Sequence, residues 1–162
     1  MIEISTLHSM DIGRKKLPHT PPYDIIPNPE GEVFFITVCC QPRGLNQLAL
    51  PHIWEAMRET ITHRQINNDC YITLFLAMPD HWHALISFPS GAHMEQTIKS
   101  MKSWLAKSQG IVWQNGFFDH RLRNRESAEE KRLYILNNPY RANLIQEGQK
   151  WPYMIDVREG QV

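Results

Sequence analysis

The stretch that decides the fold is "CYITLFLAMPDHWHALISF", residues 70–88. Aliphatic, β-branched and aromatic residues fill 70–78 and 81–88, and Pro79-Asp80 separates them, which predicts two strands joined as a hairpin. Side chains alternate along a strand, so every second residue of the later strand shares a face. One face carries His81, His83, Leu85 and Ser87, and the other carries Trp82, Ala84, Ile86 and Phe88. The second set is wholly apolar and should lie under helices, which leaves both histidines on the opposite, more open face.

The segments on either side of the hairpin alternate between strand and helix patterns. A capping box at Ser127-x-x-Glu130 should begin the last helix, and Pro139 should end it. In chain order we expect a strand at 31–40, a helix at 50–65, the hairpin strands, a helix at 93–110, a strand at 111–118 and a helix at 127–138.

The order β-α-β-β-α-β followed by a helix predicts an α+β fold. Right-handed crossovers turn it into a ferredoxin-like antiparallel sheet with both crossover helices on one face and the first and third strands central. The added C-terminal helix would then cover the histidine face.

Composition indicates a globular protein without a membrane partner. The chain has 162 residues, of which 42% are hydrophobic and 21% charged, and no run approaches the roughly 20 apolar residues of a membrane helix. Five of the eleven prolines lie in 17–30, so we expect an extended N-terminal arm over 1–30 and a single domain over 31–162. Three cysteines, an odd number with two adjacent, argue against a disulfide framework and favour a cytoplasmic location.

Charge balances overall but not locally. Lysine plus arginine equal aspartate plus glutamate at 17 each. Residues 99–132, however, include eight basic and four acidic residues, which gives this segment a net charge of +4. A solvated charged face and a surface that follows a phosphate backbone both remain open.

The histidine pair has a metal interpretation and an ordinary one. His81 and His83 have Cα atoms about 6.6–7 Å apart in a strand, so their imidazoles could share an ion, or could simply be hydrogen-bonded. On the last helix, Tyr134 and Asn138 are one turn apart. A carboxamide oxygen can ligate a metal, and a tyrosine hydroxyl can attack beside one. A core aromatic and a helix-end asparagine are the alternatives.

Two of these stretches carry a family resemblance. "MPDHWHALIS" (78–87) and "YILNNPYRANLI" (134–145) resemble the single-tyrosine HUH transposases of the insertion-sequence type, and within them the REP-associated tyrosine transposases. The segments at 14–22, 113–123 and 123–135 fit the same group, so that the resemblance spans roughly residues 14–153.

The resemblance implies a fold, an activity and a set of site residues. It implies the ferredoxin-like fold and metal-dependent cleavage and rejoining of single-stranded DNA through a 5′-phosphotyrosine. Tyr134 would be the nucleophile, and His81, His83 and Asn138 would hold Mg²⁺ or Mn²⁺. Asn138 stands where insertion-sequence relatives usually have glutamine, which keeps the carboxamide and shortens its reach.

The implied partner is single-stranded DNA next to a palindromic-repeat hairpin, bound by a monomer or a homodimer. A hairpin-binding protein with weak or regulatory cleavage is the alternative. An RNA-binding module of the same fold fits poorly because the central strands lack its aromatic signature. The aromatic side chains of Trp104, Trp113 and Phe117 could stack on bases or pack in the core. We assign no chemical step to Asp119 and His120. Our candidates for DNA contact are Arg14, Lys15, Lys16, His19, Lys99, Lys102, Lys107, Arg121, Arg123 and Arg125.

Overall fold

A five-stranded antiparallel sheet forms the centre of the protein. The computed structural model describes residues 32–159, apart from the side chains of residues 125 and 126, so the expected arm over 1–30 lies outside the described residues. The sheet order is β4-β1-β3-β2-β5. Its strands are β1 (Val33–Cys39), β2 (Tyr71–Ala77), β3 (His81–Ser87), β4 (Phe118–Leu122) and β5 (Met154–Asp156). The helices are α1 (Pro51–Ile66), α2 (Met94–Gln109), α3 (Arg125–Leu136) and α4 (Asn138–Arg141).

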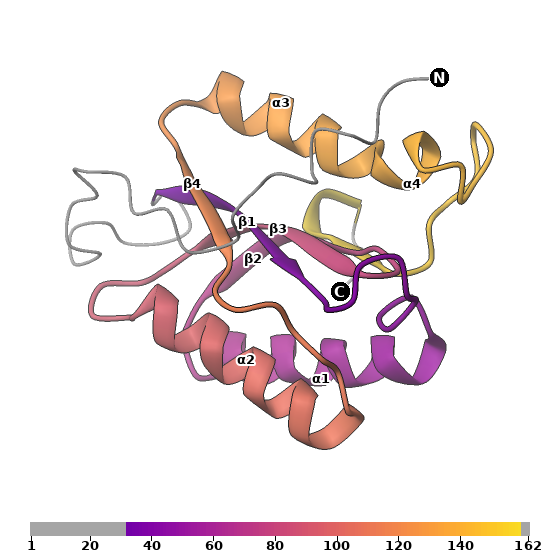
Figure 1. The fold of residues 1–162 in the computed structure, drawn as a ribbon. Coiled ribbons are helices and arrows are strands. Elements are labelled where there is room, and N and C mark those ends of the chain that lie inside the picture. Colours follow the sequence, from indigo (N-terminus) through magenta and orange to yellow (C-terminus); the bar gives the residue numbers. More distant parts are fainter. Residues whose placement is uncertain (1–31, 160–162) are drawn as a thin grey trace.

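Helices cover both faces of this sheet. Figure 1 shows α1 and α2 packed below it and α3 and α4 above it. The expected ferredoxin-like α+β fold is therefore confirmed, with β1 and β3 inside the sheet and both crossover helices on one face.

The β2–β3 hairpin divides the core in two, as its alternation predicted. Trp82, Ala84 and Ile86 belong to the cluster that contains the buried residues of α1 and α2. Leu85 belongs to a second cluster on the other face, together with Ile135 of α3. Helix α3 contacts β2, β3 and β4, so it covers the face that carries the histidines, as expected.

The fourth strand begins later than the sequence suggested. The expected strand at 111–118 is wrong: residues 111–117 are largely irregular, and β4 starts at Phe118. Gly116 has a φ of +68°, a conformation that interrupts an extended run. The segment is anchored instead by Lys102, whose Nζ donates to the carbonyls of Gln114 at 2.8 Å and Gly116 at 2.7 Å.

Helix α3 starts and stops at different residues from those expected. Its N-cap is Asn124, whose side-chain oxygen accepts the Ser127 N–H at 2.8 Å, so the capping box at Ser127 is wrong. Asparagine caps at least as well as serine, and here it lies three residues earlier. At the other end α3 stops at Leu136, and Pro139 lies in the first turn of α4. Asn138 therefore begins α4 rather than ending α3.

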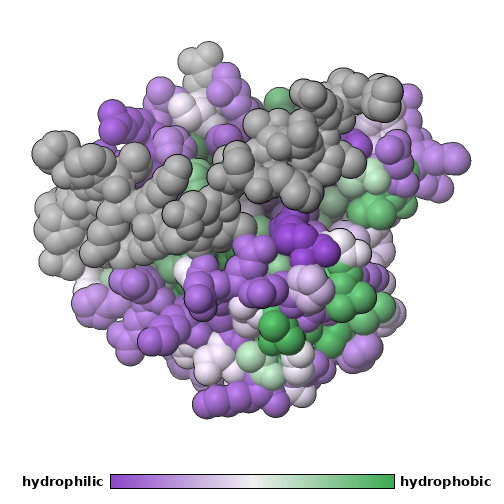
Figure 2. Space-filling model, in the orientation of Figure 1, coloured by the Kyte–Doolittle hydropathy of each residue, from purple (hydrophilic) through white to green (hydrophobic). Residues whose placement is uncertain are grey.

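The C-terminal strand β5 extends the sheet beyond β2 and was not anticipated. It pairs antiparallel with β2 through Leu74↔Asp156 and two further pairs. Figure 2 shows that hydrophilic side chains cover much of the visible surface over the α1–α2 layer, with smaller hydrophobic patches between them. Within residues 32–159, no helix is long and apolar enough to cross a membrane.

Candidate active site

The two histidines lie side by side at the end of the central strand β3. Their ring centroids are 4.8 Å apart with the planes at 75°. His81 is 7% exposed and His83 is 1% exposed, so both are buried on the face that α3 covers. The His83 ring is covered by Phe35 of β1, which stacks on it with ring centroids 5.4 Å apart, and by Tyr134 of α3.

One nitrogen of each ring is held by a neighbour. The His83 Nδ1 lies 2.7 Å from the hydroxyl oxygen of Thr37, the residue directly opposite it on β1. The His81 Nδ1 lies 2.7 Å from a carboxylate oxygen of Asp80, in the turn of the hairpin. Asp80 is itself fixed by the Gly44 N–H at 2.7 Å and the Arg43 Nε at 3.1 Å. Both ring orientations are thus set by the chain.

The other nitrogen of each ring is buried without a partner. Neither His81 Nε2 nor His83 Nε2 has a hydrogen bond among the described residues. A buried polar atom that lacks a partner is costly in free energy, so such an atom calls for an explanation. Histidines that ligate metals typically have one nitrogen fixed by a carboxylate, hydroxyl or carbonyl and the other directed at the ion.

The protonation states of the two histidines and of Asp80 also fit a metal-ligand role for the histidines. Burial lowers the pKa of His81, and burial together with the neighbouring His81 lowers the pKa of His83 well below its ordinary value. Both imidazoles are therefore neutral at pH 7 and carry a free lone pair on Nε2. Burial alone would raise the pKa of Asp80, but its hydrogen bonds with His81 and the Gly44 N–H lower it to about 2. The carboxylate beside His81 is therefore ionised.

Tyr134 and Asn138 approach this pair from above the sheet. The Tyr134 ring centroid is 5.7 Å from that of His83, and its hydroxyl makes no hydrogen bond to the described residues. The Asn138 side-chain nitrogen donates to the Tyr134 carbonyl at 2.9 Å, which leaves the carboxamide oxygen available. Tyr134 of α3 thus lies beside His83 of β3, and the Asn138 side chain of α4 is bonded to the Tyr134 backbone.

The donor set fits a divalent cation that is completed by substrate. Among the described residues, no group of three or more histidine, cysteine, aspartate and glutamate side chains could hold a metal ion. Two imidazole nitrogens and the Asn138 oxygen are what the chain offers, which leaves further coordination positions for water or phosphate oxygen. Such an incomplete protein shell is typical of catalytic rather than structural metal sites.

Two cations next to Tyr134 were missed by the sequence reading. The Lys131 Nζ lies 5.3 Å from the Tyr134 ring centroid and 5.0 Å from that of Phe35. The Arg141 guanidinium carbon lies 5.5 Å from the Tyr134 centroid. Lys131 lies three residues before Tyr134 in the expected helix, a spacing that could have indicated a shared face, whereas Arg141 lies beyond Pro139 and had no such signal.

The proposed DNA contacts of the sequence reading do not gather around the histidines. Lys99 and Lys107 are exposed on α2, across the sheet from α3, and Lys102 on the same helix is occupied by two carbonyls. Arg121 pairs with Glu32 at 2.6 Å, and Arg123 is exposed just beyond β4. Arg14, Lys15, Lys16, His19 and the side chain of Arg125 lie outside the described residues. All of these stay predictions.

The aromatic candidates and the Asp119-His120 pair are placed as follows. Phe117 is buried in the core, and Trp113 packs against the same core while its indole donates to the Lys102 carbonyl at 2.9 Å. Trp104 is 38% exposed. Asp119 pairs in register with Ile36, which places it on the α1–α2 side of the sheet, whereas the exposed His120 pairs with Phe35 on the histidine side.

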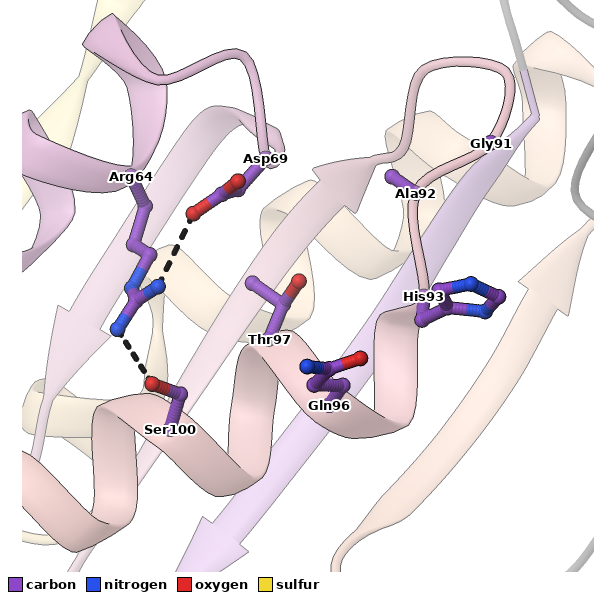
Figure 3. A pocket seen from close by; sticks show the side chains of 8 residues that line it. All are labelled: Arg64, Asp69, Gly91, Ala92, His93, Gln96, Thr97 and Ser100. Carbon is purple, nitrogen blue, oxygen red and sulfur yellow. Dashed lines mark hydrogen bonds and ion pairs between the residues drawn. The ribbon is translucent and has the colours of Figure 1, made fainter.

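A separate cavity of about 210 Å³ lies between the end of α1 and the start of α2. Figure 3 shows Arg64 reaching from α1 toward Asp69 and Ser100, at 3.0 and 2.5 Å. The guanidinium is therefore already paired, and none of the residues around this cavity belongs to the histidine site. It is lined by Arg64, Asp69, Gly91, Ala92, His93, Gln96, Thr97 and Ser100.

Known proteins share both the sequence pattern and the fold. The sequence model of the family described as "Transposase IS200 like" matches residues 36–138, which include both histidines, Tyr134 and Asn138. A REP-associated tyrosine transposase of Escherichia coli (strain K12) is 22% identical over 127 residues, 76% of each chain. A solved structure of a REP-associated tyrosine transposase bound to a REP hairpin superposes with a TM-score of 0.71 at 22% identity, over 82% of each chain.

Proposed function

The chain belongs to the family of IS200-like transposases, and from that premise we propose that it breaks and rejoins single-stranded DNA with Tyr134 as the nucleophile. The observation that carries the proposal is the pair of buried Nε2 atoms of His81 and His83, which have no partner among the described residues, beside Tyr134, whose ring centroid lies 5.7 Å from that of His83. Without a ligand, two buried nitrogens that lack partners destabilise the folded protein. A divalent cation shared by both would satisfy them and form a metal site.

The ligand set proposed for that cation is His81, His83 and the carboxamide oxygen of Asn138. Mg²⁺ or Mn²⁺ bound there would withdraw charge from a phosphate and fix its orientation. Thr37 and Asp80 hold the Nδ1 atoms of the two rings, which leaves both Nε2 lone pairs for the ion. Asn138 anchors to the Tyr134 carbonyl, so that ligand and nucleophile move together.

The proposed chemical step is a transfer of the phosphoryl group to tyrosine. The Tyr134 hydroxyl oxygen bonds to phosphorus and gives up its proton to water. The bond from phosphorus to the 3′-oxygen breaks, and that oxygen takes up a proton. The products are a 5′-phosphotyrosine and a free 3′-hydroxyl. Because the phosphoester is conserved, a second strand's 3′-hydroxyl can reverse the step without a nucleotide cofactor.

The proposed substrate is a strand next to a palindromic-repeat hairpin. Support comes from the relative of similar fold that is bound to a REP hairpin, and from the E. coli relative described as REP-associated. Helix α3 packs on the sheet of its own chain, which favours a monomer that carries a complete site.

A gel assay for a covalent adduct tests the proposal. Wild-type protein, Mn²⁺ and a labelled oligonucleotide that carries a palindrome from beside the gene should give a protein–DNA adduct that survives denaturation. EDTA should abolish the adduct, and His83→Ala should do so too, while Arg58→Gln on the opposite layer should leave it unchanged. Tight hairpin binding by wild type with no adduct under any divalent cation would contradict the proposal.

A further inference from the structure

Two cations approach the Tyr134 ring, and neither has a counter-ion among the described residues. Lys131 Nζ is 5.3 Å and the Arg141 guanidinium carbon 5.5 Å from its centroid. Among the described residues, neither has a carboxylate within 4.0 Å. Nearby arginines behave differently: Arg132 pairs with Asp156 at 2.5 Å, and Arg158 pairs with Glu129 at 2.7 Å.

The charge at this place is therefore in excess. The carboxylates of Glu129 and Asp156 are paired with Arg158 and Arg132, and Glu130, the neighbour of Lys131 in α3, makes no ion pair with Lys131 or Arg141 within 4.0 Å. A divalent cation on the histidines would increase the excess further. An electropositive surface of this kind attracts an anionic ligand, and phosphodiester oxygens are suitable partners for ammonium and guanidinium groups.

We propose that Lys131 and Arg141 are the phosphodiester contacts that hold a single strand across Tyr134. The inference rests on the proposed function and names the route that the strand takes. Lys131 lies one turn before the nucleophile on α3, and Arg141 lies at the end of α4, so the two cations bracket the tyrosine along the helical path. Lys131 supplies a point charge, and Arg141 supplies a planar donor fork that fits two phosphate oxygens.

The same route explains why the lysines of α2 are poor candidates for this strand. Lys99 and Lys107 lie on the helix layer at the opposite face of the sheet (Figure 1), and Lys102 is committed to backbone carbonyls. A strand that reaches Tyr134 from α2 would have to pass around the edge of the sheet. Lys131 and Arg141 need no such detour.

Salt-dependent binding of a homopolymer tests the pair without chemistry or a known target sequence. All variants are made in a Tyr134→Phe background and titrated with oligothymidylate of about 20 nucleotides. Each released phosphate contact should lower the slope of log affinity against log salt by about 0.7. We expect Lys131→Gln and Arg141→Gln each to reduce the slope by about that amount and to weaken binding about three- to tenfold at low salt. Lys131→Arg should retain both, because it keeps the charge.

Arg58→Gln is the control for loss of charge alone, since it removes one exposed cation of α1 on the opposite layer, and Lys107→Gln tests the rival route along α2. Unchanged slopes for Lys131→Gln and Arg141→Gln, with a reduced slope for Lys107→Gln, would overturn the proposal and place the strand on α2. Thermal melts of all variants separate loss of contact from loss of fold. The adduct assay above decides the proposed function independently, because this titration requires neither metal nor cleavage.

Discussion

Thr37 and Asp80 determine which nitrogen of each histidine is free. The sequence pattern identified both imidazoles but not these partners, because Thr37 lies more than forty residues earlier and meets His83 only through the β1–β3 register. Asp80 was visible in the sequence as a turn residue and nothing more. Its contact with His81 depends on the hairpin geometry. Partners across a sheet cannot be assigned until the register is known.

Thr37→Val tests the role of the hydroxyl at constant volume. Loss of the hydrogen bond frees the His83 ring to rotate, so we expect Mn²⁺ affinity to fall about 10–100-fold, the usual effect of removing such a partner. Calorimetric titration of Mn²⁺ provides the measurement. Thr60→Val, at a buried threonine of α1 on the other face, should bind Mn²⁺ as wild type does. Equal affinity in both variants would show that Thr37 does not orient the ligand.

The buried histidines also make a prediction about pH. Burial favours the neutral imidazole, so protons compete with the metal only at pH values below the ordinary histidine pKa of about 6.5. We expect Mn²⁺ affinity to stay constant as pH falls through that value and to decline only at lower pH. A decline centred at or above pH 6.5 would contradict neutral, buried ligands. In metal-free protein the unfolded chain takes up more protons below about pH 6.5, so the free energy of unfolding should decrease there.

At the scale of the element, α3 is fixed by contacts on two sides. Tyr134 packs toward β1 and β3, against Phe35 and His83. Arg132 reaches the other way to Asp156 of β5, which is fully buried and takes both guanidinium nitrogens, at 2.7 and 2.5 Å. The two side chains lie nearly half a helical turn apart, so together they fix the rotation of α3 about its axis. That rotation sets where the Tyr134 hydroxyl points.

Asp156→Asn should therefore impair both stability and cleavage. Removing one member of a buried ion pair leaves the other charge uncompensated and costs about 3–5 kcal/mol in free energy of unfolding. Urea denaturation measures the cost. Glu159→Gln breaks the exposed pair with Lys150 at 3.2 Å in the same C-terminal segment and should cost less than about 1 kcal/mol. Comparable losses in the two variants would mean that the Arg132–Asp156 pair does not hold α3.

Local patterns predicted most elements but misplaced those with competing signals. The β2–β3 hairpin and both crossover helices have a single strong periodicity, and the structure confirms them. The apolar run at 111–118 is irregular because Gly116 turns the chain and Ile111 and Phe117 enter the core without a strand. Strand β5 has only three residues, Met154–Asp156, and exists through its pairing with β2, so no local signal marks it.

At the scale of the whole molecule, α3 folds back over the sheet of its own chain, and β5 holds it there. We propose that one chain therefore supplies a complete site from β3, α3 and α4. The sequence alone named both a monomer and a homodimer, because a helix can dock on its own sheet or on a partner's.

Mixing inactive variants distinguishes these arrangements. Tyr134→Phe lacks the nucleophile and His83→Ala lacks a metal ligand, so a swapped dimer would regain one intact site when the two are mixed. We expect no adduct from the mixture, because each chain supplies its own tyrosine. Recovery of a substantial part of wild-type adduct would show that α3 acts in the partner. Sedimentation of the wild type with hairpin DNA gives the oligomeric state directly.

The central claim is that Tyr134 attacks a phosphate held above His81 and His83. Its most direct test is to digest the covalent adduct formed by wild-type protein with Mn²⁺ and the hairpin oligonucleotide, and to identify the modified peptide by mass spectrometry. We predict a single nucleotide-bearing tyrosine, Tyr134, linked to a 5′-phosphate, and no such peptide from Tyr134→Phe. An adduct on any other residue, or an undiminished adduct in Tyr134→Phe, would contradict the mechanism.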